Sequence, residues 1–396
     1  MRRVVIALLT LAAAALVTAP TIALTLGRYD ADTGLRFWPI DARAQASKAS
    51  ELIAADLKVS TLERADGLSR AALRREPVNV AAARAQTLIA AARGQERQTL
   101  AWARYAEGLS RRDFGVQTML IELAVARGDV PGALIHYDRA LRTRKAAGDV
   151  LFPVLFGAAS DPNVLPALTA MLGRRPEWWY DFTVKWQTQS PPVEPLFTIL
   201  MAERPDVSVP RERMLAIAAM RQMVTAGRID LAARLHDRIA PAGTPRAGTF
   251  VDGRFDSGHD LAPFAWDITS EGDLGGAVER RGEPPRSALT IDVSGDRSGT
   301  VAQQLVRLAP GRYRLALRVG ELSTDGIVPG VSILCVGSTE PLAEQRLGAA
   351  GPSVRTLSFE IPGNCSAQTV RISGTAGEND SLPRPWITDL TMRRLN

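Results

Sequence analysis

Cysteine, histidine and lysine are all scarce in this chain of 396 residues. The two cysteines and three well-separated histidines are too few for zinc fingers, iron–sulfur centres or c-type haem attachment. Only 4 of the 48 basic residues are lysines, and no polybasic run concentrates the formal charge of +6. The sequence therefore predicts no resident metal, no cofactor and no nucleic-acid partner.

The sequence also lacks a recognisable catalytic constellation. No histidine stands in the setting of a triad, a metal site or a nucleophile elbow. His259 lies in the polar loop 256–260, which is either a ligand-contact loop or a plain turn. Glu378 and Asp380 are a possible glycosidase pair, but turn chemistry explains their Gly-Glu-Asn-Asp-Ser setting. We predict that the protein is not an enzyme.

Residues 1–28 determine the predicted compartment. Arg2 and Arg3 precede Val4–Leu26, a stretch of 23 residues without a charge. As a helix this stretch would be about 34 Å long, enough to cross a hydrocarbon core of about 30 Å. The positive-inside rule then predicts a single-pass inner-membrane protein, anchored through residues 4–26, with the bulk of the chain in the periplasm. The alternative is a cleaved signal peptide and a secreted or periplasmic protein, although Pro20 disfavours cleavage after Ala19.

Residues 41–240 have the apolar spacing of helices. In Leu123–Leu141, Gly128 ends one helix, Ala133 permits close helix packing and Tyr137 fills the groove. The segment resembles a tetratricopeptide repeat, and the Arg-Gly pair at 93–94 lies 34 residues before the pair at 127–128. This resemblance implies a solenoid of helical hairpins whose groove binds an envelope protein. The alternative is that the helices only form a spacer.

A cluster of tryptophans falls within this helical region. Trp178, Phe182 and Trp186 have the i, i+4, i+8 spacing of one helix face, which predicts core packing. Trp179 lies one residue round the helix, and we expect it to be the more exposed ring.

After the linker-like stretch 240–248 the apolar period changes from 3.6 to 2. The clearest strand is Gly311–Val319, with apolar residues on one face and arginines on the other. Eight to ten short strands with turns every 8–12 residues predict an antiparallel β-sandwich over residues 248–396. Cys335 and Cys365 lie 30 residues apart in this region, and an oxidising periplasm favours a disulfide between them over two free thiols.

Four segments in order carry a further resemblance: 250–256, 263–266, 308–315 and 386–390. Together they resemble the jelly-roll, galactose-binding-like domain shared by many carbohydrate-binding modules. The resemblance implies either sugar binding or a non-binding accessory domain. Related modules often hold calcium, and Asp252, Asp256 and Asp389 could supply oxygens, but their spacing does not indicate a site. We therefore predict no metal.

Sugar recognition requires an exposed aromatic ring beside polar groups. The candidates are Trp266 with Asp267, and Trp386, each with core packing as the competing role. Arg312, Arg314 and Arg318 lie on the polar side of one strand and could pair with uronate groups, or could simply be a solvated face.

The combined prediction is a multidomain α-then-β chain: an anchor over 1–28, a tetratricopeptide-like solenoid over 41–240 and a jelly-roll sandwich over 248–396. This order resembles accessory proteins of bacterial exopolysaccharide or envelope-glycan synthesis and export. The alternatives are a purely structural envelope scaffold and a glycan hydrolase or lyase with a divergent site.

Overall fold

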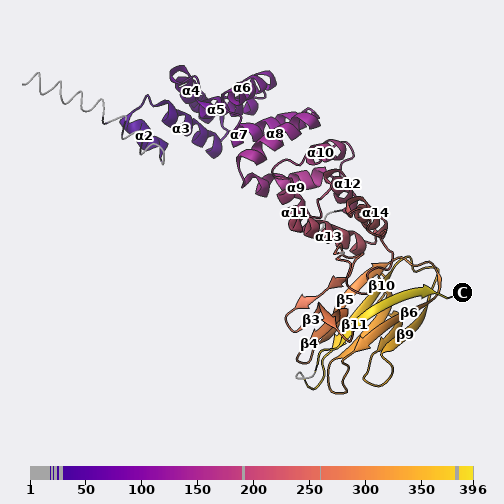
Figure 1. Ribbon diagram of the computed structural model, residues 1–396. Coiled ribbons are helices and arrows are strands. Elements are labelled where there is room, and N and C mark those ends of the chain that lie inside the picture. The colour runs from indigo at the N-terminus through magenta and orange to yellow at the C-terminus, as the bar shows by residue number, and fades with distance from the viewer. Residues whose placement is uncertain are drawn as a thin grey trace, which may run out of the picture. The chain divides into compact units, whose positions relative to one another are not determined.

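A computed structural model describes residues 30–189, 192–258, 260–379 and 383–395, together with Thr18, Thr21 and Thr25. Apart from these three threonines, the predicted anchor lies outside the described residues, as do His259 and Asp380. Among the described residues, no helix has the length and apolar character needed to span a bilayer. Helices come first and strands follow, as the sequence predicts (Figure 1).

The chain forms two compact units. The first runs to Met171 and includes Pro176–Trp178, and the second comprises Leu172–Arg175 and Trp179–Asn396. Helices α2 to α9 belong to the first unit, and α10 ends where the second begins. The helix bounds are α2 Ala31–Phe37, α3 Ala42–Ala55, α4 Val59–Arg75, α5 Val80–Ala92, α6 Glu96–Leu109, α7 Phe114–Ala126, α8 Val130–Thr143, α9 Ala147–Ala158 and α10 Leu165–Leu172.

Helices α3–α4, α5–α6 and α7–α8 pack as successive hairpins. The first helix of each hairpin starts at a side chain that accepts backbone N–H groups: Asp41, Asn79 and Asp113. Gly94 and Gly128 join the helices of the second and third hairpins at a φ of +68°, which glycine adopts without a steric penalty. The helical region is thus present as predicted, and its assignment to the tetratricopeptide family remains a prediction.

The aromatic cluster agrees with the expectation in part. Trp178, Phe182 and Trp186 are buried, which confirms their role in the core. The expectation for Trp179 is wrong, because its side chain is only 6% exposed. The guanidinium of Arg175 lies 4.3 Å from the centre of the Trp179 ring and covers it.

The second unit contains the last helices and all the strands of the described residues. Its helices are α11 Trp179–Gln187, α12 Val193–Glu203, α13 Pro210–Thr225 and α14 Ile229–Ile239. Its strands are β1 Asp267–Ile268, β2 Ser270–Glu271, β3 Leu274–Arg281, β4 Arg286–Val293, β5 Ser298–Val306, β6 Gly311–Gly320, β7 Val328–Cys335, β8 Pro341–Arg346, β9 Val354–Ile361, β10 Gln368–Thr375 and β11 Trp386–Arg394.

The strands form two antiparallel sheets. The five-stranded sheet has the order β1-β5-β10-β7-β8, and the six-stranded sheet has the order β2-β3-β4-β11-β6-β9. The period-2 residues read from the sequence, such as Leu315, Ile333 and Ile372, fill the core between the sheets. Cys335 and Cys365 are joined by a disulfide with a Cα–Cα distance of 5.6 Å.

A second apolar cluster connects the last helices to the strands. Phe264 and Leu305 are buried in the same cluster as Met220 of α13 and Leu235 of α14. The stretch 240–248 therefore separates helices from strands, but it does not separate two compact units. Burial of shared apolar side chains unites α12–α14 with the sandwich.

The shared cluster predicts that α14 and β5 lose stability together. The Phe264 side chain is 2% exposed, so Phe264→Ala should cost the second unit about 3–5 kcal/mol through lost burial and the cavity left behind. Hydrogen–deuterium exchange should show reduced protection in both α14 and β5. Phe37→Ala, at an exposed position, is the control. A loss of protection confined to α14 would contradict the shared cluster.

Two buried glutamates lie beside the loop between α12 and α13. Glu212 binds Arg175 and accepts the backbone N–H of Asp206 at 2.8 Å. Glu203 is 3% exposed and accepts only the Thr183 hydroxyl, at 3.2 Å. Burial raises the pKa of Glu203 to about 8.

The raised pKa predicts a pH-dependent stability. A carboxyl group that is protonated more readily in the folded state stabilises that state fully below its ordinary pKa of 4.5 and loses this contribution as pH rises towards 8. Glu203→Gln should therefore gain stability relative to the native chain between pH 5 and 8, by up to about 1.4 kcal/mol per pH unit. Denaturant unfolding measures the difference, with Glu122→Gln at an exposed position as control. A difference that is constant with pH would contradict the prediction.

Candidate functional site

Trp266 belongs to the core of the sandwich. Its side chain is 7% exposed, and its ring lies 5.2 Å from the ring of Phe255. The indole N–H donates to the backbone carbonyl of Asp252 at 3.0 Å. Of the two roles considered for Trp266, core packing is the one seen. Its neighbour Asp267 forms an ion pair at 2.6 Å with Arg221 of α13.

Trp386 is also buried, although it lies on the outer side of its sheet. The next residue, Ile387, points into the core, so Trp386 faces away from it. The ring packs against Gly320 and Gly282 and is 8% exposed. Neither tryptophan offers the exposed ring face on which a sugar could stack.

The arginines predicted on β6 lie on the outer side of the six-stranded sheet. Arg312 and Arg314 are exposed. Arg318 binds Asp389 at 3.2 Å, and the same carboxylate accepts Arg286 at 3.0 Å. Two guanidinium groups therefore bind the carboxylate of Asp389, one of the possible calcium ligands. Within the described part of the chain, no group of three His, Cys, Asp or Glu residues could hold a metal ion.

The outer side of the five-stranded sheet carries a row of polar residues that crosses every strand. The register pairs Asp267 with Gln303, Gln303 with Arg371, Arg371 with Ser332, and Ser332 with Glu344. Their inward neighbours, such as Ile372 and Ile333, belong to the core. Period-2 alternation therefore places the row on the face away from the core.

A second row lies beside the first and creates a groove. It pairs Thr300 with Ser373, Ser373 with Gly330, and Gly330 with Arg346. A Cβ atom at Gly330 would lie 2.6 Å from the Ser373 hydroxyl, so only glycine leaves this space open. The resulting groove, "the sheet groove" below, has a volume of about 300 Å³ and includes Arg371, Ser332, Glu344 and Arg346.

The sheet groove combines charges of both signs. Arg371, Arg346 and Glu344 form no ion pair with any of the described residues. The Nε of Arg371 is buried and has no hydrogen-bond partner in the described structure, which leaves an unsatisfied donor at the base of the groove. None of the described lining residues is aromatic. The groove therefore offers guanidinium donors, hydroxyl groups and one carboxylate acceptor, but no stacking surface.

The amino-acid sequence alone does not indicate this groove. The signal available was the alternation of polar residues in β10, where Arg371, Ser373 and Thr375 face outward. A polar outer face is common in antiparallel sheets, so this alternation does not by itself predict a binding site.

Comparison with known proteins gives structural neighbours only. No protein-family model matches the chain, and no curated protein matches its sequence. One similar solved structure is the module TmCBM61 in complex with β-1,4-galactotriose, at 15% identity, with 38% of this chain and 100% of the module covered and a TM-score of 0.26. A family 4 carbohydrate-binding module has 19% identity, 37% and 100% coverage and a TM-score of 0.27.

The active domain of tailspike protein 4 from bacteriophage CBA120 has 8% identity, 36% and 20% coverage and a TM-score of 0.26. The carbohydrate-binding modules match the C-terminal sandwich. The bound galactotriose belongs to its own module, and the ligand of this chain has to be inferred from its own residues.

Proposed function

We propose that the chain is a non-enzymatic glycan-binding protein that takes a sugar chain into the sheet groove. The observation that carries this proposal is the buried Nε of Arg371, which has no partner in the described structure. It lies among outward hydroxyl groups and beside Glu344 and Arg346, which form no ion pair with the described residues. A sugar hydroxyl both donates and accepts, so it can satisfy an arginine and a carboxylate at once. Groups of both signs suit a hydroxyl-rich ligand better than a simple ion. In this groove, hydrogen bonds to charged and hydroxyl groups take the place of the aromatic stacking that we expected from the sequence.

The groove is the stronger of two candidate surfaces on the sandwich. On the outer side of the six-stranded sheet, Arg318 is already bound to Asp389, and Arg312 stands opposite Glu360 in the register. That surface is a solvated strand face with partly satisfied charges. In the described structure each surface keeps a buried donor without a partner, Arg371 Nε in the groove and Trp386 Nε1 on the six-stranded sheet. The groove is concave and sets hydroxyl groups beside its donor, where a ligand can satisfy it.

The two surfaces provide matched variants for the test. Glu344 and Arg346 are exposed and two residues apart on β8, just as Arg312 and Arg314 are on β6. The full chain is titrated calorimetrically with neutral and uronate-containing oligosaccharides. Replacing both Glu344 and Arg346 with alanine should weaken binding at least tenfold, because hydrogen bonds to charged groups are worth about 1.5–3 kcal/mol each. Arg312→Ala with Arg314→Ala should leave the affinity unchanged.

The opposite ranking of the two double variants would place the glycan on the six-stranded sheet. If the native chain binds no oligosaccharide, glycan binding is wrong and the structural scaffold takes its place. Chromatography of the sugars after incubation tests the non-enzymatic part, since shorter products would reveal a hydrolase or lyase.

The proposed setting is the bacterial envelope, with residues 4–26 as an inner-membrane anchor and the rest of the chain in the periplasm. Support comes from the charge-free stretch after Arg2 and Arg3 and from the Cys335–Cys365 disulfide, since disulfides persist in oxidising compartments. There the sandwich would hold an exopolysaccharide or envelope glycan near its synthesis or export machinery, with the helical hairpins contacting an envelope protein.

A topology experiment tests this setting. A reporter enzyme that folds only in the periplasm, fused after Tyr29, should be active, and the full chain should sediment with membranes. A soluble form beginning after residue 19 or 44 would show that the segment is a cleaved signal peptide. An inactive reporter with the chain in the cytoplasm would contradict the envelope setting.

A further inference from the structure

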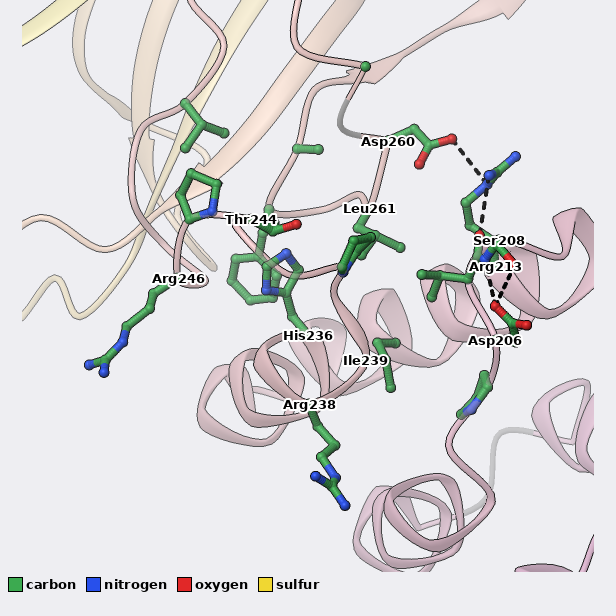
Figure 2. Close-up of a pocket in the computed structure, with 18 of the residues that line it drawn as sticks. Asp206, Ser208, Arg213, His236, Arg238, Ile239, Thr244, Arg246, Asp260 and Leu261 are labelled. Carbon is green, nitrogen blue, oxygen red and sulfur yellow. Dashed lines mark hydrogen bonds and ion pairs between the residues drawn. The ribbon is translucent and has the colours of Figure 1, made fainter.

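A separate cavity lies within the second unit, away from the sheet groove. The α12–α13 loop, the C-terminal end of α14 and the segment 241–265 enclose a volume of about 640 Å³ (Figure 2). Cavities of this size accommodate small ligands or a few residues of a peptide. Gly258 and Asp260, two described residues of the polar loop singled out in the sequence, line it.

The apolar part of the cavity wall is mainly aliphatic. Pro205 and Val207 come from the α12–α13 loop, and Ile239 from the end of α14. Pro241 and Leu261 come from the segment that follows α14. Phe264 is the aromatic residue among the described lining residues, and its ring packs edge-on against His236 with 5.2 Å between centres. Because the Phe264 ring is buried, it offers no face on which a pyranose could stack.

Positive charge surrounds this aliphatic wall. Arg204, Arg238 and Arg246 line the cavity, are exposed and form no ion pair with the described residues. Figure 2 shows Arg238 and Arg246 extending on one side, while on the other Arg213 binds Asp260 at 3.0 Å. The carboxylate of Asp206 accepts the hydroxyl and the backbone N–H of Ser208. The described lining residues therefore keep an excess of uncompensated guanidinium groups.

The cavity is held open by internal bonds and has an unused polar group. Glu212 accepts the N–H of Asp206 and so fixes the α12–α13 loop, and the carboxylate of Asp237 accepts the N–H of Ala247 at 2.8 Å and fixes the opposite loop. The hydroxyl of Thr244 is buried in the wall without a hydrogen-bond partner in the described structure. A ligand can therefore bind without first ordering the loops, and a backbone group of that ligand can satisfy Thr244.

We infer that this cavity binds an extended acidic peptide segment of a partner protein, which places an aliphatic side chain against Ile239 and Leu261 and its carboxylates beside Arg238 and Arg246. Charge complementarity selects an acidic ligand, since guanidinium forks suit carboxylates. The aliphatic part of the wall favours a peptide over an acidic sugar, because aliphatic side chains gain from burial there.

Fluorescence anisotropy on the full chain tests this inference. The probe is a labelled peptide that alternates glutamate with leucine and valine, compared with the same peptide carrying lysine for glutamate and with labelled tetragalacturonate. We expect the acidic peptide to bind at least tenfold more tightly than either of the others. Raising the salt concentration should weaken its binding, because the arginines are exposed and their charges are screened.

Two kinds of variant locate the binding. Arg238→Glu with Arg246→Glu should weaken binding of the acidic peptide at least tenfold, and Thr249→Trp, at an exposed position of the lining, should do so by filling the entrance. The controls are Arg97→Glu with Arg104→Glu on α6 and Thr356→Trp on β9, all at exposed positions. These should bind as the native chain does.

Three outcomes would overturn the inference. Absence of binding by the acidic peptide removes it directly. Equal weakening by the α6 variant shows attraction to charge anywhere on the protein. Tighter binding of tetragalacturonate that is lost in the Arg238 and Arg246 variant makes the cavity a sugar site.

Discussion

Burial of Phe264 and Leu305 against α13 and α14 is the interaction that joins the last helices to the sandwich and places the wall of the cavity beside them. Phe264 follows the loop that lines the cavity, and Leu305 lies on the same strand and face as Gln303 in the polar row. The Arg221–Asp267 ion pair links α13 to the end of that row. One apolar cluster thus positions the wall of the cavity and one end of the polar row, and close packing makes such a cluster resist deformation.

Alternate residues of each strand face either the core of the sandwich or its outer surface. Side chains of the core come from odd or even positions, and the positions between them are free to vary because they contribute little to burial. On the five-stranded sheet these outward positions hold charged and hydroxyl residues around Gly330. On the six-stranded sheet they hold the Trp386 ring and the Arg286–Asp389–Arg318 contacts, which cover part of the surface.

Local patterns in the sequence predict the elements but not their partners. Period 3.6 and period 2 locate the helices and the strands, because each reflects one buried face of one element. The burial of Trp179 depends on Arg175, and the unit boundary depends on which cluster buries Phe264 and Leu305. The sheet groove depends on the strand order, since positions 300, 332, 344 and 371 become neighbours only through long-range pairing. Such contacts have no local signature.

The sheet groove and the cavity differ in chemistry. Because both lie in the second unit, binding at one could change the affinity of the other. A sugar in the sheet groove would contact groups of both signs, whereas a peptide in the cavity would meet an aliphatic wall and an excess of arginines. Coupling between two ligands requires each to favour a different state of the structure that joins them. The cluster around Phe264 is closely packed, and hydrogen bonds to Glu212 and Asp237 fix the cavity loops. This arrangement favours independent, additive binding of the two proposed ligands.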